Sequence, residues 1–60
     1  MNVEKAEEIL DNYINGNISD FKEQIRGLTK ADLIFFVLYV SETGYADYES
    51  ILHTIKKYLE

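Results

Sequence analysis

His53 is the only histidine in the chain and the first residue to consider for metal or acid–base chemistry. A metal site or a general base ordinarily needs a second histidine, a cysteine or converging carboxylates nearby. Glu49 lies one helical turn before His53, and this pair would give only a weak surface metal contact. We therefore interpret His53 as a solvated surface residue, and we expect no catalytic residue, no metal and no cofactor.

Serine and glycine offer no stronger site. A nucleophilic serine needs a base, which here would have to be His53, and no serine lies in a nucleophile elbow. Ser19 is better explained as a helix cap. A phosphate-binding loop needs clustered glycines after a strand, whereas the glycines of this chain are isolated and fit helix ends. The serines and glycines are Ser19, Ser41, Ser50, Gly16, Gly27 and Gly44.

Charge is the clearest chemical property of the chain, with a net charge of −5 from six Lys and Arg against eleven Asp and Glu. This balance argues against direct binding to nucleic acid or to an anionic membrane, and it suits a basic protein partner. Four acidic residues fall on neighbouring turns of the first predicted helix. They are either a solvated surface or a contact that imitates the phosphate row of DNA for a basic partner. These residues are Glu4, Glu7, Glu8 and Asp11.

The longest apolar stretch, residues 33–40, reads Leu-Ile-Phe-Phe-Val-Leu-Tyr-Val. Such a run is either a buried strand or a helix that is apolar on every side. Its flanks favour a helix over about residues 30–43. Thr29 and Asp32 have the spacing of a capping box, and Gly44 fits a left-handed helix end with Tyr45 against Val40. The stretch is far shorter than the ~20 residues of a membrane helix.

A helix of this composition has more apolar surface than sixty residues can cover. At about 100° per residue, its apolar side chains divide into two sides. One side can face the core of the chain, and the other needs further helices or a partner. The first side is Leu33, Phe36, Val37 and Val40, and the second is Phe35, Leu38 and Tyr39 with Ala31.

Apolar spacings of three and four predict three further helices, over about residues 2–15, 18–26 and 46–59. Asn15-Gly16 could alternatively form a hairpin turn, but its flanks do not alternate. Asn17 and Ser19 both remain as caps of the second helix. The predicted fold is all-α, a compact three- to four-helix bundle with short Gly/Asn turns, forming one domain over residues 1–60. The turn at residues 27–29 resembles that of a helix-turn-helix, but the apolar helix after it does not suit DNA.

These features predict a non-enzymatic protein that acts by protein–protein interaction. Phe35, Leu38 and Tyr39 would anchor a partner, with Tyr45 at a nearby turn, since tyrosine is enriched at interfaces. The small acidic chain has the style of phage or mobile-element inhibitors that occlude a basic or nucleic-acid-binding surface. The alternative is a homodimer formed through the same side. A small enzyme or ligand carrier ranks last, because so small a core leaves little room for a pocket.

The expected location is the cytoplasm. The chain has no cysteine, which suits a reducing compartment, and its first residues are acidic rather than basic before an apolar run.

Overall fold

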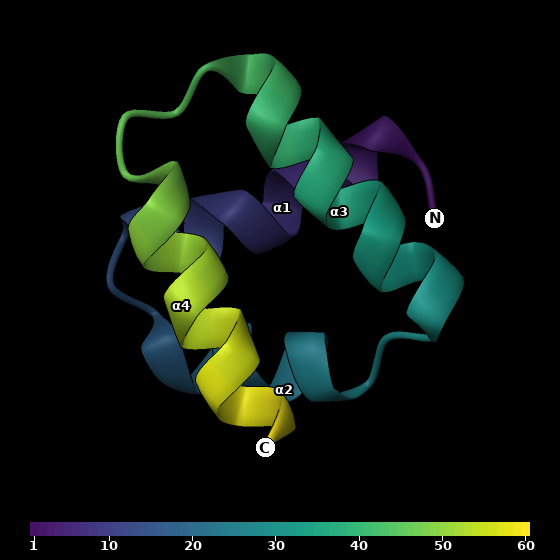
Figure 1. Ribbon diagram of the computed structural model, residues 1–60, viewed down its shortest axis with the longest axis vertical. Helices are drawn as coiled ribbons and strands as arrows, with labels where there is room; N and C mark the ends of the chain where they lie inside the picture. Colours follow the sequence, from purple (N-terminus) through teal and green to yellow (C-terminus); the bar gives the residue numbers. More distant parts are fainter.

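Four α-helices and no strand make up the computed structural model, which describes residues 1–60 (Figure 1). The all-α prediction is therefore confirmed. α4 begins two residues later than predicted, at residue 48 rather than 46, because a tight turn from Tyr45 precedes it, and α1 is one residue shorter than predicted at each end. The helices are α1 (Val3–Ile14), α2 (Ile18–Arg26), α3 (Lys30–Thr43) and α4 (Tyr48–Leu59).

Side-chain caps begin two of the helices. The Asn2 side chain accepts a hydrogen bond from the Lys5 amide at 2.8 Å, and Thr29 Oγ1 accepts one from the Asp32 amide at 3.1 Å. The second half of the predicted capping box is wrong, because the Asp32 carboxylate instead accepts from the Met1 ammonium at 3.0 Å. A charged donor is a stronger partner than a backbone amide. This contact ties the chain terminus to the first turn of α3.

The predicted end of α3 is confirmed at Gly44, which has a φ of 70° in the left-handed region. The backbone hydrogen bond that usually accompanies such an ending, from the Tyr45 amide to the Val40 carbonyl, does not form, and the apolar contact of Tyr45 with Val40 stays a prediction. The hydroxyl of Thr43 donates to the Val40 carbonyl at 2.7 Å instead, so that carbonyl is satisfied from within the helix. At the start of α2, Asn17 rather than Ser19 occupies the cap position, without a side-chain hydrogen bond.

Gly44→Ala is expected to lower the free energy of unfolding by about 1 kcal/mol, because a left-handed backbone penalises a side chain even in open space. Gly27→Ala is the matched control. Gly27 has a φ of −87°, and an added Cβ would meet only ordinary contacts, the nearest at 3.5 Å. Urea unfolding followed by circular dichroism compares the two variants. Equal stability of both would contradict the assigned role of Gly44.

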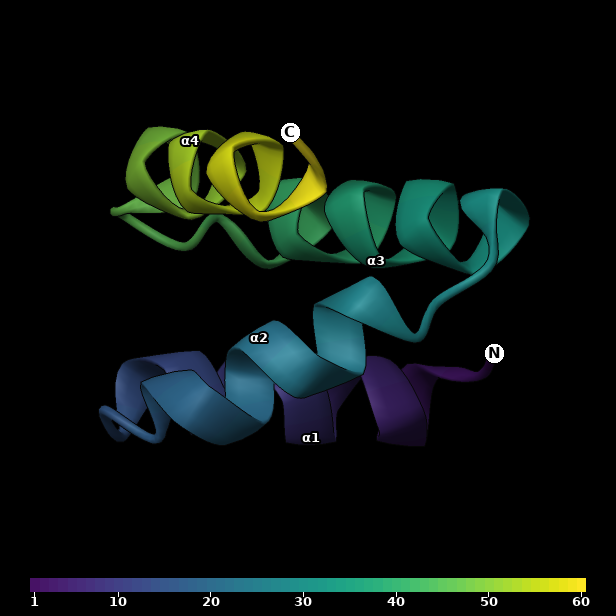
Figure 2. The ribbon, with the colours of Figure 1, turned by 90° about the horizontal axis from the view of Figure 1, so that it is seen from below.

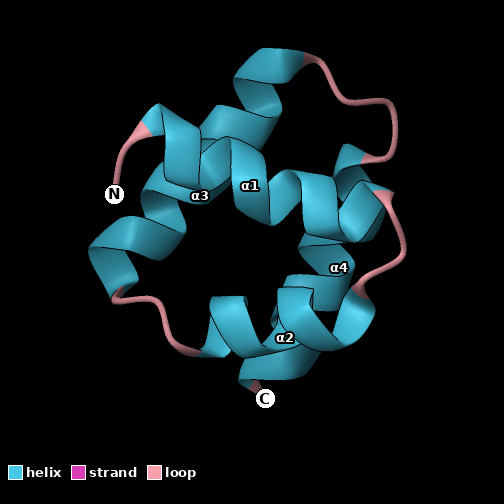
Figure 3. Ribbon diagram, turned by 180° about the vertical axis from the view of Figure 1, so that it is seen from behind, coloured by secondary structure: helices cyan, strands magenta, loops and turns pink.

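The helices form two layers, with α1 and α2 in one and α3 and α4 in the other (Figure 2). Each helix packs on two others, in the closed order α1, α2, α4, α3 and back to α1. Figure 3 shows the four helices from behind. The space between them is filled by nine buried apolar side chains from all four helices. The core consists of Ala6, Ile9, Leu10, Phe21, Ile25, Phe36, Val40, Ile51 and Ile55.

Phe21 lies at the centre of an aromatic group. Its ring centroid is 5.0 Å from that of Tyr13, 6.3 Å from Phe36 and 6.1 Å from Tyr58, so this α2 residue contacts rings of the other three helices. All three pairs are tilted, a geometry that favours aromatic attraction. None of the four helices has the length and apolarity needed to cross a membrane.

Candidate functional site

The outward side of α3 carries three large apolar side chains in contact with solvent. Ile34 is 52 % exposed, Phe35 36 % and Leu38 60 %. Ile34 and Phe35 stand four and three residues before Leu38, so each adjoins Leu38 on the helix surface and the three form one continuous surface. We call Ile34, Phe35 and Leu38 the α3 apolar face.

The opposite side of the same helix forms part of the core. Phe36 and Val40 are completely buried, and Leu33 and Val37 pack against the core cluster at its edge. The two sides predicted from helical periodicity are therefore confirmed for these residues, with Phe35 and Leu38 outside. The helices that pack on α3 are α1 and α4. They contact its inner side, and Ile34, Phe35 and Leu38 on the outer side stay exposed.

Two of the predicted contact tyrosines are only half exposed. Tyr39 packs partly against the core, because it lies between Phe35 and Phe36 around the helix axis and so belongs to the edge of the outward side. Tyr45 packs edge-on against Tyr13, with ring centroids 6.4 Å apart. Its partial burial, then the charge of Asp47 and the Tyr13 phenol, raise the pKa of Tyr45 above its ordinary value. Part of the surface of each ring is therefore buried by contacts within the chain, and only the rest is available to a partner.

Ile34 was not assigned to either side by sequence reasoning. It stands four residues before Leu38, and this spacing alone places it on the outward side. Glu42 stands four residues after Leu38 and is exposed, so it is the acidic residue that borders the α3 apolar face.

The four acidic residues predicted on the first helix are all exposed on α1. Glu8 forms a loose ion pair with Lys5 at 3.7 Å. These residues are exposed on a helix of one layer, whereas the α3 apolar face is exposed on a helix of the other layer (Figure 2). The two predicted contact surfaces therefore lie on different sides of the molecule, and one flat partner surface cannot cover both. The acidic surface consists of Glu4, Glu7, Glu8 and Asp11.

The residues first considered for chemistry are not brought together into a reacting group. His53 is exposed and forms no hydrogen bond within the chain, and no cluster of three or more potential metal ligands forms. The Ser50 hydroxyl shares a hydrogen bond of 3.1 Å with the Tyr13 hydroxyl rather than with a base. Ser19 and Ser41 are exposed on α2 and α3.

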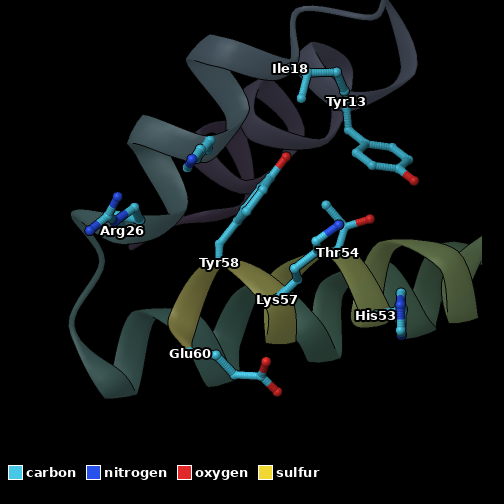
Figure 4. A pocket seen from close by; sticks show the side chains of 9 residues that line it. Tyr13, Ile18, Arg26, His53, Thr54, Lys57, Tyr58 and Glu60 are labelled. Carbon is cyan, nitrogen blue, oxygen red and sulfur yellow. The ribbon is translucent and has the colours of Figure 1, made fainter.

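A groove between α2 and α4 is the feature that sequence reasoning missed (Figure 4). Its volume is about 810 Å³, and its walls include Lys22 and Arg26 from α2 and His53, Lys57 and Tyr58 from α4. The expectation of little room for a pocket considered only the interior, whereas this groove lies at the surface between two helices. The signal was present in two pairs of basic residues with helical spacing, 22/26 and 53/57.

Comparison of the chain with protein-family models, with curated proteins and with solved structures finds no match.

Proposed function

We propose that this protein acts without catalysis, by docking the α3 apolar face onto a basic protein partner and blocking the surface that it covers. The observation that supports this proposal is the exposure of three large apolar side chains, Ile34, Phe35 and Leu38, on one helix. Large adjoining apolar side chains on a small protein are characteristic of interaction surfaces. A helix that presents apolar anchors three and four residues apart suits an apolar groove on a partner.

Charge favours a basic partner over a second copy. Each copy carries −5, so two copies repel each other through their net charge, whereas a basic partner is attracted. A basic surface around an apolar recess would pair with Glu42 at short range. The acidic residues of α1 lie on another side and would act by long-range steering, which raises the association rate more than the affinity. The lack of cysteine suits action in the cytoplasm.

Leu38→Glu is expected to abolish partner binding while leaving the fold intact, because Leu38 is the most exposed of the three anchors. A buried hot-spot residue at an interface contributes about 2 kcal/mol or more, or roughly thirtyfold in affinity. Leu59→Glu on α4 is the matched control, since Leu59 is 52 % exposed and the charge change is the same. Wild type and both variants are compared in affinity purification from the cells that express the protein, followed by binding measurements with the purified partner.

The proposal is supported if Leu38→Glu alone loses a basic protein that the wild type and Leu59→Glu retain, and if that binding weakens as salt increases. Retention of the partner by Leu38→Glu would overturn it. Light scattering on the purified chain tests the alternative of self-association. A dimer that Leu38→Glu converts to a monomer would assign the α3 apolar face to a second copy.

A further inference from the structure

The α2–α4 groove, together with a smaller hollow beside it, contains most of the Lys and Arg side chains of this acidic protein. Lys22 and Arg26 come from α2 and Lys57 from α4, and Lys56 lines a smaller hollow that shares His53 and Lys57 with the groove. These four residues, which we call the groove cations, are four of the six Lys and Arg in the chain. The groove is separate from the α3 apolar face, so its role does not depend on the proposed function.

None of the groove cations forms an ion pair within the chain. The ion pairs of the structure are Met1 with Asp32 and Lys5 with Glu8. The chain has eleven acidic residues, and the one that lines the groove is Glu60, whose side chain extends away from the Tyr58 ring (Figure 4). Glu23 lines a separate hollow that also includes Lys22 and Arg26. The groove therefore holds unneutralised positive charge that a bound anion would compensate.

Helix dipoles explain only part of this arrangement. Arg26, Lys56 and Lys57 lie in the last turns of their helices, where a cation is favourable. Lys22 lies a full turn before Arg26, over the Tyr58 ring at 5.5 Å from its centroid, and His53 lies a turn before Lys57. Lys22 and His53 both line the groove, and neither lies at a helix end whose dipole would favour a cation there. Cations from two helices thus converge on one space.

The size and donors of the groove fit a small anion. A volume of about 810 Å³ lies within the range of roughly 300–1,000 Å³ found for small-molecule sites. The Tyr58 side chain projects from α4 toward α2, and its hydroxyl forms no hydrogen bond within the chain (Figure 4). Arg26 presents a planar guanidinium that can bind two oxygens of one phosphate, and the lysines act as point charges beside it.

We propose that the α2–α4 groove binds a small, multiply charged phosphate of the class of pyrophosphate and nucleoside di- and triphosphates. Several cations from two helices match an anion whose charge is spread over two or three phosphate groups. A long nucleic acid is disfavoured, because the phosphates that extend beyond the groove would be repelled by a chain with a net charge of −5.

The test is a titration of the ¹⁵N-labelled chain with inorganic pyrophosphate at constant ionic strength, followed by NMR amide shifts. The wild type is expected to show saturable shifts at the groove residues of α2 and α4. The double variant Lys22→Gln/Arg26→Gln is expected to bind about tenfold more weakly or worse, because two charge-assisted contacts are lost. Lys5→Gln/Lys30→Gln is the matched control, since it removes the same charge outside the groove and should keep the wild-type affinity.

Three results would overturn the proposal. Shifts that never saturate would show only unspecific attraction. An equal loss of affinity in the control variant would show that net charge, and not the groove, governs binding. Equal saturation by a glutamate-rich peptide at the same charge would assign the groove to carboxylates instead of phosphates. The amide spectra also report whether each variant is folded. Affinities are therefore compared only for variants whose spectra show the native fold.

Discussion

Phe36→Ala is expected to lower the free energy of unfolding far more than any surface substitution on the same helix. Phe36 is completely buried in the core and its ring packs near that of Phe21. Truncating a buried phenylalanine costs about 3–5 kcal/mol, from lost apolar transfer and from the cavity that remains. A chain of 60 residues has a total stability of only about 3–9 kcal/mol. One substitution therefore removes at least about a third of the stability, and all of it if the total lies at the low end of that range.

The neighbouring residue gives a matched control. Phe35 stands next to Phe36 in the sequence but on the α3 apolar face, where Phe35→Ala deletes the same atoms from the surface. We expect a loss below about 1 kcal/mol there, as for most surface substitutions. Urea unfolding followed by circular dichroism at matched temperature gives both values. Similar losses for the two variants would mean that α3 does not face the core through Phe36.

Phe21→Ala is expected to have an effect at the upper end of the same range, about 4–5 kcal/mol. Phe21 is also completely buried, and its ring is the shared neighbour of Tyr13, Phe36 and Tyr58. Each tilted aromatic pair adds about 0.5–1.5 kcal/mol beyond the buried area. Removing the ring therefore weakens the contacts of α2 with the other three helices at once.

The companion variant Phe21→Leu distinguishes the loss of aromatic contacts from the effect of the cavity. Leucine refills most of the volume, so the chain should stay folded with a smaller loss, while the tyrosine rings lose their aromatic neighbour. Near-ultraviolet circular dichroism, which reports how Tyr13 and Tyr58 are packed, should weaken in Phe21→Leu. An unchanged signal together with wild-type stability would contradict the central role of this ring.

Local sequence was sufficient to determine the helices. Cap residues such as Asn2 and Thr29, the left-handed glycine at position 44 and apolar spacings of three and four act within one helical turn, so they can be read without knowing the fold. The same periodicity separated Phe36 and Val40 from Phe35 and Leu38, because the angle between two side chains on a helix depends only on their spacing.

Tertiary structure decided what lies between the helices. The ion pair of Met1 with Asp32 and the packing of Tyr45 on Tyr13 join residues 31 and 32 positions apart, and no local rule links them. The α2–α4 groove exists only because two helices that are separated by α3 in the sequence lie side by side. The placement of the α1 acidic surface and the α3 apolar face on different sides has the same origin. Charge and apolarity were visible in the sequence, but the directions in which they point depend on how the helices pack around one shared core.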